Sequence, residues 1–221
     1  METPSRLNLA QIRSCLVRTQ HQFKHINAEL TVKKTPPSDE VIANLLSGYA
    51  LIDEFIAEGI DLFKYGNSHF FLELNHTVLF EHAPVSATED ASQFEATENY
   101  FYQNQTAGIG QLMEWLNIHD HDSVWKQAAG IFTFMLSQPQ LFLEGNHRTG
   151  SLIMSYVLMK KGHAPFVLSA ENARFFFEPA EMTKKRSKNN LVDDWLYLPK
   201  QTRKFACLLE KEQDKAFVLE Q

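Results

Sequence analysis

The apolar residues of the N-terminal segment repeat at helical spacing. Behind Asn8 they recur every three or four positions, at Leu9, Ile12, Leu16, Phe23 and Ile26. Since an α-helix has about 3.6 residues per turn, this spacing places them on one face of a helix. Asn8 is a suitable cap, with Gln11 three residues later. The pattern predicts a helix from residue 9 to a break at 33–37.

A second helix is predicted to begin at Ser38-Asp39-Glu40 and to end near Gly59. Further helical patterns cover about 91–103, the residues after Gly110, 124–137 and 149–161. Residues 69–82 differ, because two apolar runs of three residues flank Asn75 and His76. These runs predict a small β-hairpin or an irregular flap, and the pattern does not decide between the two.

The pattern as a whole predicts a mainly helical chain forming a single domain over residues 1–221. N-terminal helices are expected over 8–60, a core over about 90–180 and a C-terminal helical extension over 185–221. The chain has 221 residues, 44% of them hydrophobic and 22% charged, which is ordinary for a soluble globular protein.

The charge balance limits the partners. A net charge of −6 argues against a nucleic-acid-binding surface over the whole molecule. A basic cluster stands near the C-terminus and consists of Lys184, Lys185, Arg186 and Lys188. It is interpreted as a solvated surface, with the holding of a partner as the alternative. Similarly, His119 to Asp122 are interpreted as a turn capped by Asp122 or Ser123 rather than as a metal cluster.

The location of the protein is predicted from what its sequence lacks. The N-terminus has no basic start followed by an apolar core, and no apolar run is long enough to span a bilayer. Two distant cysteines, Cys15 and Cys207, indicate neither a disulfide framework nor a zinc ribbon. We therefore expect a cytoplasmic protein without a membrane partner, while secretion by a non-standard route stays open.

Residues 142–150 carry the candidate chemistry. Glu144 precedes a Gly145-Asn146 turn at which a helix is predicted to begin, and Arg148 follows the turn. Backbone N–H groups and the helix dipole make such a helix N-terminus attractive to phosphate. A carboxylate can hold a metal ion beside the phosphate, and a guanidinium can pair with its oxygens. The segment therefore predicts a phosphate-binding loop between two apolar helices.

This loop resembles the motif of the Fic family, H-P-F-x-D/E-G-N-G-R-x-x-R. Aligned without gaps, residues 140–151 match it at Phe142, Glu144, Gly145, Asn146 and Arg148. The similarity in character extends from about Leu112 to Phe166, with an apolar helix on each side of the loop. The resemblance implies an all-α fold, a compact Fic-like core with the hairpin as a small flap.

The resemblance also implies an activity, the transfer of AMP from ATP to a protein hydroxyl. By this similarity Glu144 would bind Mg²⁺, and the nucleotide phosphates would be held by Gly145, Asn146, His147, Arg148 and Gly150. Phe142 would anchor the loop. ATP or another nucleotide, Mg²⁺ and a protein target are the partners that the resemblance implies.

Four motif positions depart from the family. Gln140 stands at the histidine that acts as general base, Leu141 at the proline, His147 at the second glycine and Ser151 at the last arginine. A glutamine amide cannot accept a proton near neutral pH, and general-base catalysis contributes about 10²- to 10⁴-fold. His147 is a candidate substitute, although it lies on the other side of the turn from Gln140.

The leading hypothesis is a degenerate Fic-like protein that keeps a phosphate- or nucleotide-binding loop. Standard histidine-dependent AMP transfer is then not expected, and whether the protein is an enzyme stays open. One alternative is a transferase of the same fold that moves AMP, phosphoryl or glycosyl groups by another mechanism. The other is a non-enzymatic module that binds a protein or forms a homo-oligomer.

Overall fold

The computed structural model describes residues 6–80 and 88–219, and the regular secondary structure of these residues is helical. The helices are α1 (Leu9–Glu29), α2 (Asp39–Ala57), α3 (His69–Phe80), α4 (Thr88–Gln103), α5 (Ile109–Ile118), α6 (Val124–Leu136), α7 (Asn146–Lys160), α8 (Ala173–Lys184), the π-helix η1 (Asp193–Tyr197), α9 (Leu198–Lys211) and the 3₁₀ turn η2 (Lys215–Phe217). The prediction of an all-α fold is confirmed.

Local capping signals set several helix starts. The side chain of Asn8 accepts a hydrogen bond from the backbone N–H of Gln11, 3.2 Å away, as predicted. Ser38 caps α2 in the same way through Val41 N–H. Ser123 caps α6, which confirms the interpretation of the preceding residues as a turn. Each cap gives a partner to one N–H group that the helix itself leaves unbonded.

The prediction of a hairpin or flap over 69–82 is wrong for the described part of that segment. Residues 69–80 form the single helix α3. Phe71, Leu74 and Val78 are buried and recur at helical spacing, so they line one face that packs on α2 and α7. Asn75 is buried on the same face. The polar pair 75–76 therefore interrupts the apolar pattern without ending the helix.

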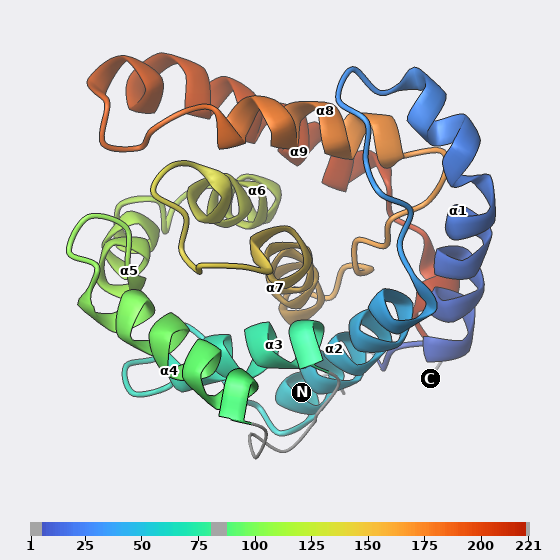
Figure 1. Cartoon of the computed structure of the whole chain (residues 1–221), viewed down its shortest axis with the longest axis horizontal. Coiled ribbons are helices and arrows are strands. Elements are labelled where there is room, and N and C mark those ends of the chain that lie inside the picture. Colours follow the sequence, from blue (N-terminus) through green and yellow to red (C-terminus); the bar gives the residue numbers. More distant parts are fainter. Residues whose placement is uncertain (1–5, 81–87, 220–221) are drawn as a thin grey trace.

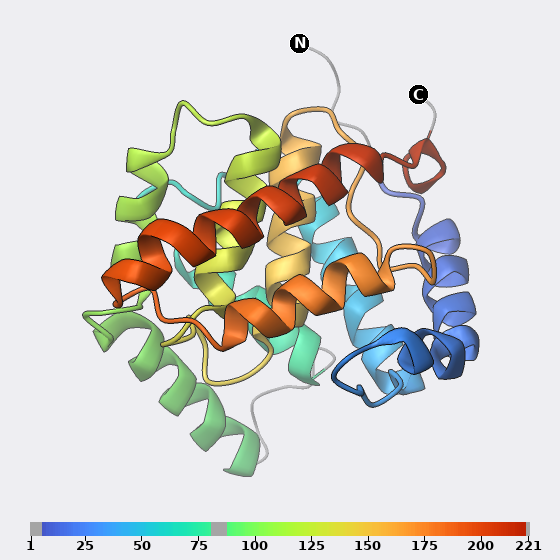
Figure 2. The same cartoon turned by 90° about the horizontal axis from the view of Figure 1, so that it is seen from above.

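Helix α7 is the centre of the molecule (Figure 1). It packs against α6 on one side and against α2 and α3 on another. Figure 2 shows α8 and α9 side by side across α6 and α7. Every residue of α7 from Thr149 to Met159 is buried, so the helix is held by packing on several sides. The loop that precedes α7 therefore has a rigid base.

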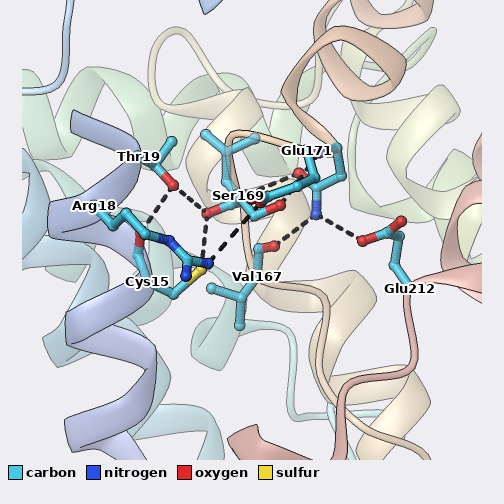
Figure 3. Close-up of polar contacts among 9 residues, drawn as sticks. Cys15, Arg18, Thr19, Val167, Ser169, Glu171 and Glu212 are labelled. Carbon is cyan, nitrogen blue, oxygen red and sulfur yellow. Dashed lines mark hydrogen bonds and ion pairs between the residues drawn. The ribbon is translucent and has the colours of Figure 1, made fainter. Parts of the chain in front are cut away.

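The segment between α7 and α8 is tied to both ends of the chain (Figure 3). The carbonyl of Leu168 accepts hydrogen bonds from Thr19 and, at 3.7 Å, from the thiol of Cys15. Burial raises the pKa of the Cys15 thiol, against the opposing effect of Arg18. On the other side, the amide of Asn172 donates to the carbonyl of Val167 at 2.9 Å and to the carboxylate of Glu212, just after α9, at 3.4 Å. The bonds of Leu168 fix the segment against α1, and the Asn172–Glu212 bond ties it to the end of α9.

Candidate functional site

The loop before α7 has a shape that only glycine accommodates at position 145. Gly145 has φ 78°, in the left-handed region that favours glycine. A Cβ at this position would lie 2.7 Å from the amide nitrogen of Asn75. That amide donates to the carbonyl of Glu144 at 2.9 Å and to the hydroxyl of Thr149 at 3.0 Å. One side chain of α3 thus spans the turn.

Asn146 holds the loop together from within. Its amide oxygen accepts a hydrogen bond from the N–H of Phe142 at 2.9 Å, and its amide nitrogen donates to the Phe142 carbonyl at 2.7 Å. The ring of Phe142 is 1% exposed and stacks on Phe101 with centroids 5.2 Å apart. Because both polar atoms of the Asn146 side chain are engaged, its contribution to anion binding is limited to its backbone N–H.

The loop opens onto a cavity of about 280 Å³. It is lined by Gln140, Leu143, Glu144, Gly145, Asn146, His147, Arg148 and Lys184. Within the part of the chain that the structure describes, the backbone N–H groups of residues 146–148 have no acceptor. They sit at the positive end of the helix dipole of α7. The cavity therefore combines free N–H donors with two cationic side chains and one carboxylate.

Lys184 is the charged member of this cavity that sequence reasoning missed. It lies in the last turn of α8, and its ammonium is 3.9 Å from the carboxylate of Glu181. The only sequence signal was its membership in the basic cluster 184–188. Its arrival at the loop depends on how α8 packs across the bundle, which no local pattern encodes.

The other basic residues of that cluster correct its interpretation as a solvated surface. Lys188 donates to the carbonyls of Phe134 and Ser137 at 2.9 and 3.0 Å, and to that of Pro139. Burial lowers the pKa of Lys188 to about 7. Arg186 pairs with Asp193 at 3.1 Å. Of the four basic residues, Lys185 is the exposed one, because the chain turns inward around it.

Arg148 is anchored toward α3. One of its N–H groups donates to the carbonyl of Val78 at 2.6 Å. Burial lowers the pKa of Arg148, an effect opposed by the carboxylates of Glu144 and Glu40, and the group stays a cation at neutral pH. The anchor fixes the guanidinium while leaving other N–H groups for an anion.

Glu144 offers one exposed carboxylate at the cavity. Its oxygen accepts a hydrogen bond from the Gln93 amide of α4 at 3.2 Å. The described residues contain no group of three or more histidine, cysteine or acidic side chains that could hold a metal by themselves. Mg²⁺ is commonly bound by one or two carboxylates together with substrate phosphates. The donor set therefore fits a Mg²⁺ ion carried by a phosphate ligand.

Gln140 and His147 are poorly arranged for general-base catalysis. The Gln140 amide donates to the carbonyl of Leu136 at 3.2 Å, at the end of α6. The ring of His147 lies 6.3 Å from the rings of Phe132 and Phe176, and its Nε2 atom is buried without a partner among the described residues. Burial, with help from Lys184 and Lys34, lowers the pKa of His147 to about 4.

The structure places Gly150 and Ser151, the last two residues of the aligned segment, away from the cavity at the loop. Gly150 lies in the first turns of α7, where a Cβ would come within 2.7 Å of Phe132. Its role is therefore close packing of α6 on α7. The hydroxyl of Ser151 donates back to the carbonyl of Arg148 at 2.8 Å. Neither residue lines the cavity at the loop.

Comparisons with known proteins address the fold. No protein-family model matches the sequence, and no curated protein matches it significantly. The crystal structure of a Fic domain-containing signaling protein from Bacteroides thetaiotaomicron VPI-5482 is similar, with a TM-score of 0.50 and 15% sequence identity. The match covers 93% of this chain and 92% of that one. At this identity the likeness shows the fold, and the chain has a Fic-like helical fold.

A separate finding concerns membranes. Among the described residues, none of the helices combines the length and the apolar character that crossing a bilayer requires.

Proposed function

We propose that this protein is a degenerate Fic-like protein whose loop, residues 142–148, binds the phosphate groups of a nucleotide together with Mg²⁺. The observation that carries the proposal is the convergence of free N–H groups, Arg148, Lys184 and Glu144 on one cavity. Phosphate is the ligand class that such a set of donors and charges recognises.

Each residue has a distinct role in this proposal. The N–H groups of the first turn of α7 and the guanidinium of Arg148 bind phosphate oxygens. Lys184 supplies from α8 the second cation, which the motif position of Ser151 no longer provides. Glu144 holds Mg²⁺, and the ion neutralises phosphate charge when it is bound. Asn75 and Asn146 keep the loop in shape.

Histidine-dependent AMP transfer is not part of the proposal. The amide of Gln140 has no proton affinity near neutral pH, and it is already bonded to the end of α6. The Nε2 atom of His147 is buried against the aromatic core rather than exposed to an incoming hydroxyl. Both observations support phosphate binding without the usual chemistry of the motif.

Calorimetry with inorganic tripolyphosphate and with ATP, each with and without Mg²⁺, tests the proposal. Charge-assisted hydrogen bonds contribute about 1.5–3 kcal/mol, so Lys184→Ala is expected to weaken tripolyphosphate binding about tenfold or more. Lys185→Ala is the matched control, because that neighbouring side chain is exposed and does not line the cavity. The proposal would be refuted if neither tripolyphosphate nor ATP binds, or if the two substitutions weaken binding equally.

The proposed loss of chemistry has its own test. Native protein incubated with labelled ATP and a cell extract is expected to transfer no AMP. The double variant Gln140→His, His147→Gly restores the family residues at two motif positions. Labelling by the native protein would show that it is an active transferase with another base. GTP, UDP-sugars and CDP-compounds in the same assay examine other donors.

A further inference from the structure

A second cavity of about 400 Å³ lies beside the loop, on the side of α1 and α2. It has a largely apolar lining, which includes Leu16, Phe23, Leu45, Leu168, Phe176 and Phe177. His147 and Arg148 line this cavity as well as the one at the loop. Its volume falls in the range typical of small-molecule sites, about 300–1,000 Å³.

The segment between α1 and α2 lines one side of this cavity and is bonded to both α1 and α8. Figure 1 shows it running from the end of α1 past α8 to the start of α2. The Asn27 amide binds both the N–H and the carbonyl of Lys34, each at 2.8 Å. On the other side, Glu178 accepts from Thr31 N–H at 2.6 Å, and Lys34 pairs with Glu181 of α8. The cavity is therefore preformed.

Most polar groups around this cavity already have partners. The Tyr49 hydroxyl donates to the Phe166 carbonyl at 2.6 Å, and the Ser151 hydroxyl donates to the Arg148 carbonyl. Lys34 is neutralised by Glu181. Arg148 differs. Of its five N–H groups, one has an acceptor among the described residues, the carbonyl of Val78. An apolar chamber with one such cation favours a ligand that has an apolar body and one anionic group.

We propose that this cavity binds a small aromatic carboxylate. The ring would lie among the phenylalanine side chains of α1 and α8, where apolar surface and ring-to-ring contacts favour it. The carboxylate would pair with Arg148, whose planar fork of donors matches its two oxygens. The proposal does not require that the loop bind phosphate, although both sites use Arg148.

Calorimetry with naphthoate, and with its neutral relative naphthylmethanol, tests the charge requirement. Naphthoate is expected to bind the native protein at least about tenfold more tightly than the alcohol, since the difference is one charge-assisted pair. Arg148→Met is expected to bring naphthoate to the affinity of the alcohol. Equal affinities in the native protein, or naphthoate binding that survives Arg148→Met, overturns the proposal.

A second set of variants tests the place of binding. Leu45→Trp fills the cavity from α2 and is expected to abolish naphthoate binding. Phe175→Trp is the control, because it puts the same indole on the exposed face of α8. Leu45 does not line the loop cavity, so Leu45→Trp leaves tripolyphosphate binding unchanged if both proposals hold. Unaltered naphthoate binding by a folded Leu45→Trp variant overturns the cavity proposal alone.

A measurement on the native protein covers the case in which Leu45→Trp does not fold. Nuclear Overhauser effects are expected between the naphthoate ring protons and the methyl groups of Leu45 and Leu168. Binding without these contacts overturns the proposal.

Discussion

The buried imidazole of His147 makes the stability of this fold sensitive to mild acid. Burial of the ring and the charges of Lys184 and Lys34 favour its neutral form, so its pKa falls from 6.5 to about 4 on folding. Between these values the unfolded chain binds more protons than the folded one. Lowering the pH through this window therefore favours the unfolded chain, and the free energy of unfolding rises again as the pH increases.

The magnitude follows from the two pKa values. The full difference corresponds to about 3 kcal/mol, since each pKa unit is about 1.4 kcal/mol. At pH 5 the part already lost is about 2 kcal/mol, because the unfolded imidazole is almost fully protonated there and the folded one is mostly neutral. At pH 7.5 the loss is close to zero. The loss of about 2 kcal/mol at pH 5 is a large share of the roughly 5–15 kcal/mol that stabilises a typical domain.

Urea unfolding followed by circular dichroism, at pH values from 7.5 to 5, measures the effect. His147→Phe keeps an aromatic ring between Phe132 and Phe176 and removes the titrating group. We expect the loss of stability from pH 7.5 to 5 to be about 2 kcal/mol smaller in this variant than in the native protein. His121→Gln, at a side chain that is 96% exposed, is the control and is expected to keep the native profile. Parallel profiles for native protein and His147→Phe would refute the reasoning.

Two further predictions use matched pairs in the same urea assay. Gly145 and Gly162 both have φ 78°, but an added Cβ meets Asn75 at Gly145 and open space at Gly162. Gly162→Ala is expected to cost about 1 kcal/mol of strain, and Gly145→Ala about 1–2 kcal/mol more; equal costs would contradict the clash. Lys188→Met leaves the carbonyls that Lys188 binds without this donor and is expected to cost about 1–3 kcal/mol. Lys185→Met is expected to change stability by less than about 0.5 kcal/mol, and a similar loss in both would contradict the capping role.

Much of the helical architecture could be predicted because its signals are local. Asn8, Ser38 and Ser123 each bond the N–H group three residues later, so a cap can be recognised within one turn of sequence. The apolar spacing of α1 likewise reports its one buried face. These features need no knowledge of where the rest of the chain lies.

The errors arose where burial depends on tertiary packing. Asn75 broke the apolar pattern of α3 and suggested a turn, yet it is buried because the loop before α7 and the first turn of α7 supply its partners. Lys184 and Lys188 resembled a solvated charged run, but the packing of α8 and α9 on α6 brings them inward. Within the loop, Glu144 and Arg148 could be identified because they flank the Gly145-Asn146 turn in sequence. The second cavity could not, because helices far apart in the sequence line it.

The bonds of Asn75 also bear on how relatives of this protein can be recognised. A short contiguous motif loses its signal when a few of its positions change, as we propose for Gln140, His147 and Ser151. The pairing of a buried amide on α3 with Gly145 and Thr149, about seventy residues away, rests on the shape of the turn rather than on catalysis. Chains that have drifted in the catalytic positions but still need this turn would retain that distant pair. We therefore propose its presence as a search criterion for proteins of this fold, independent of the residues at the departing motif positions.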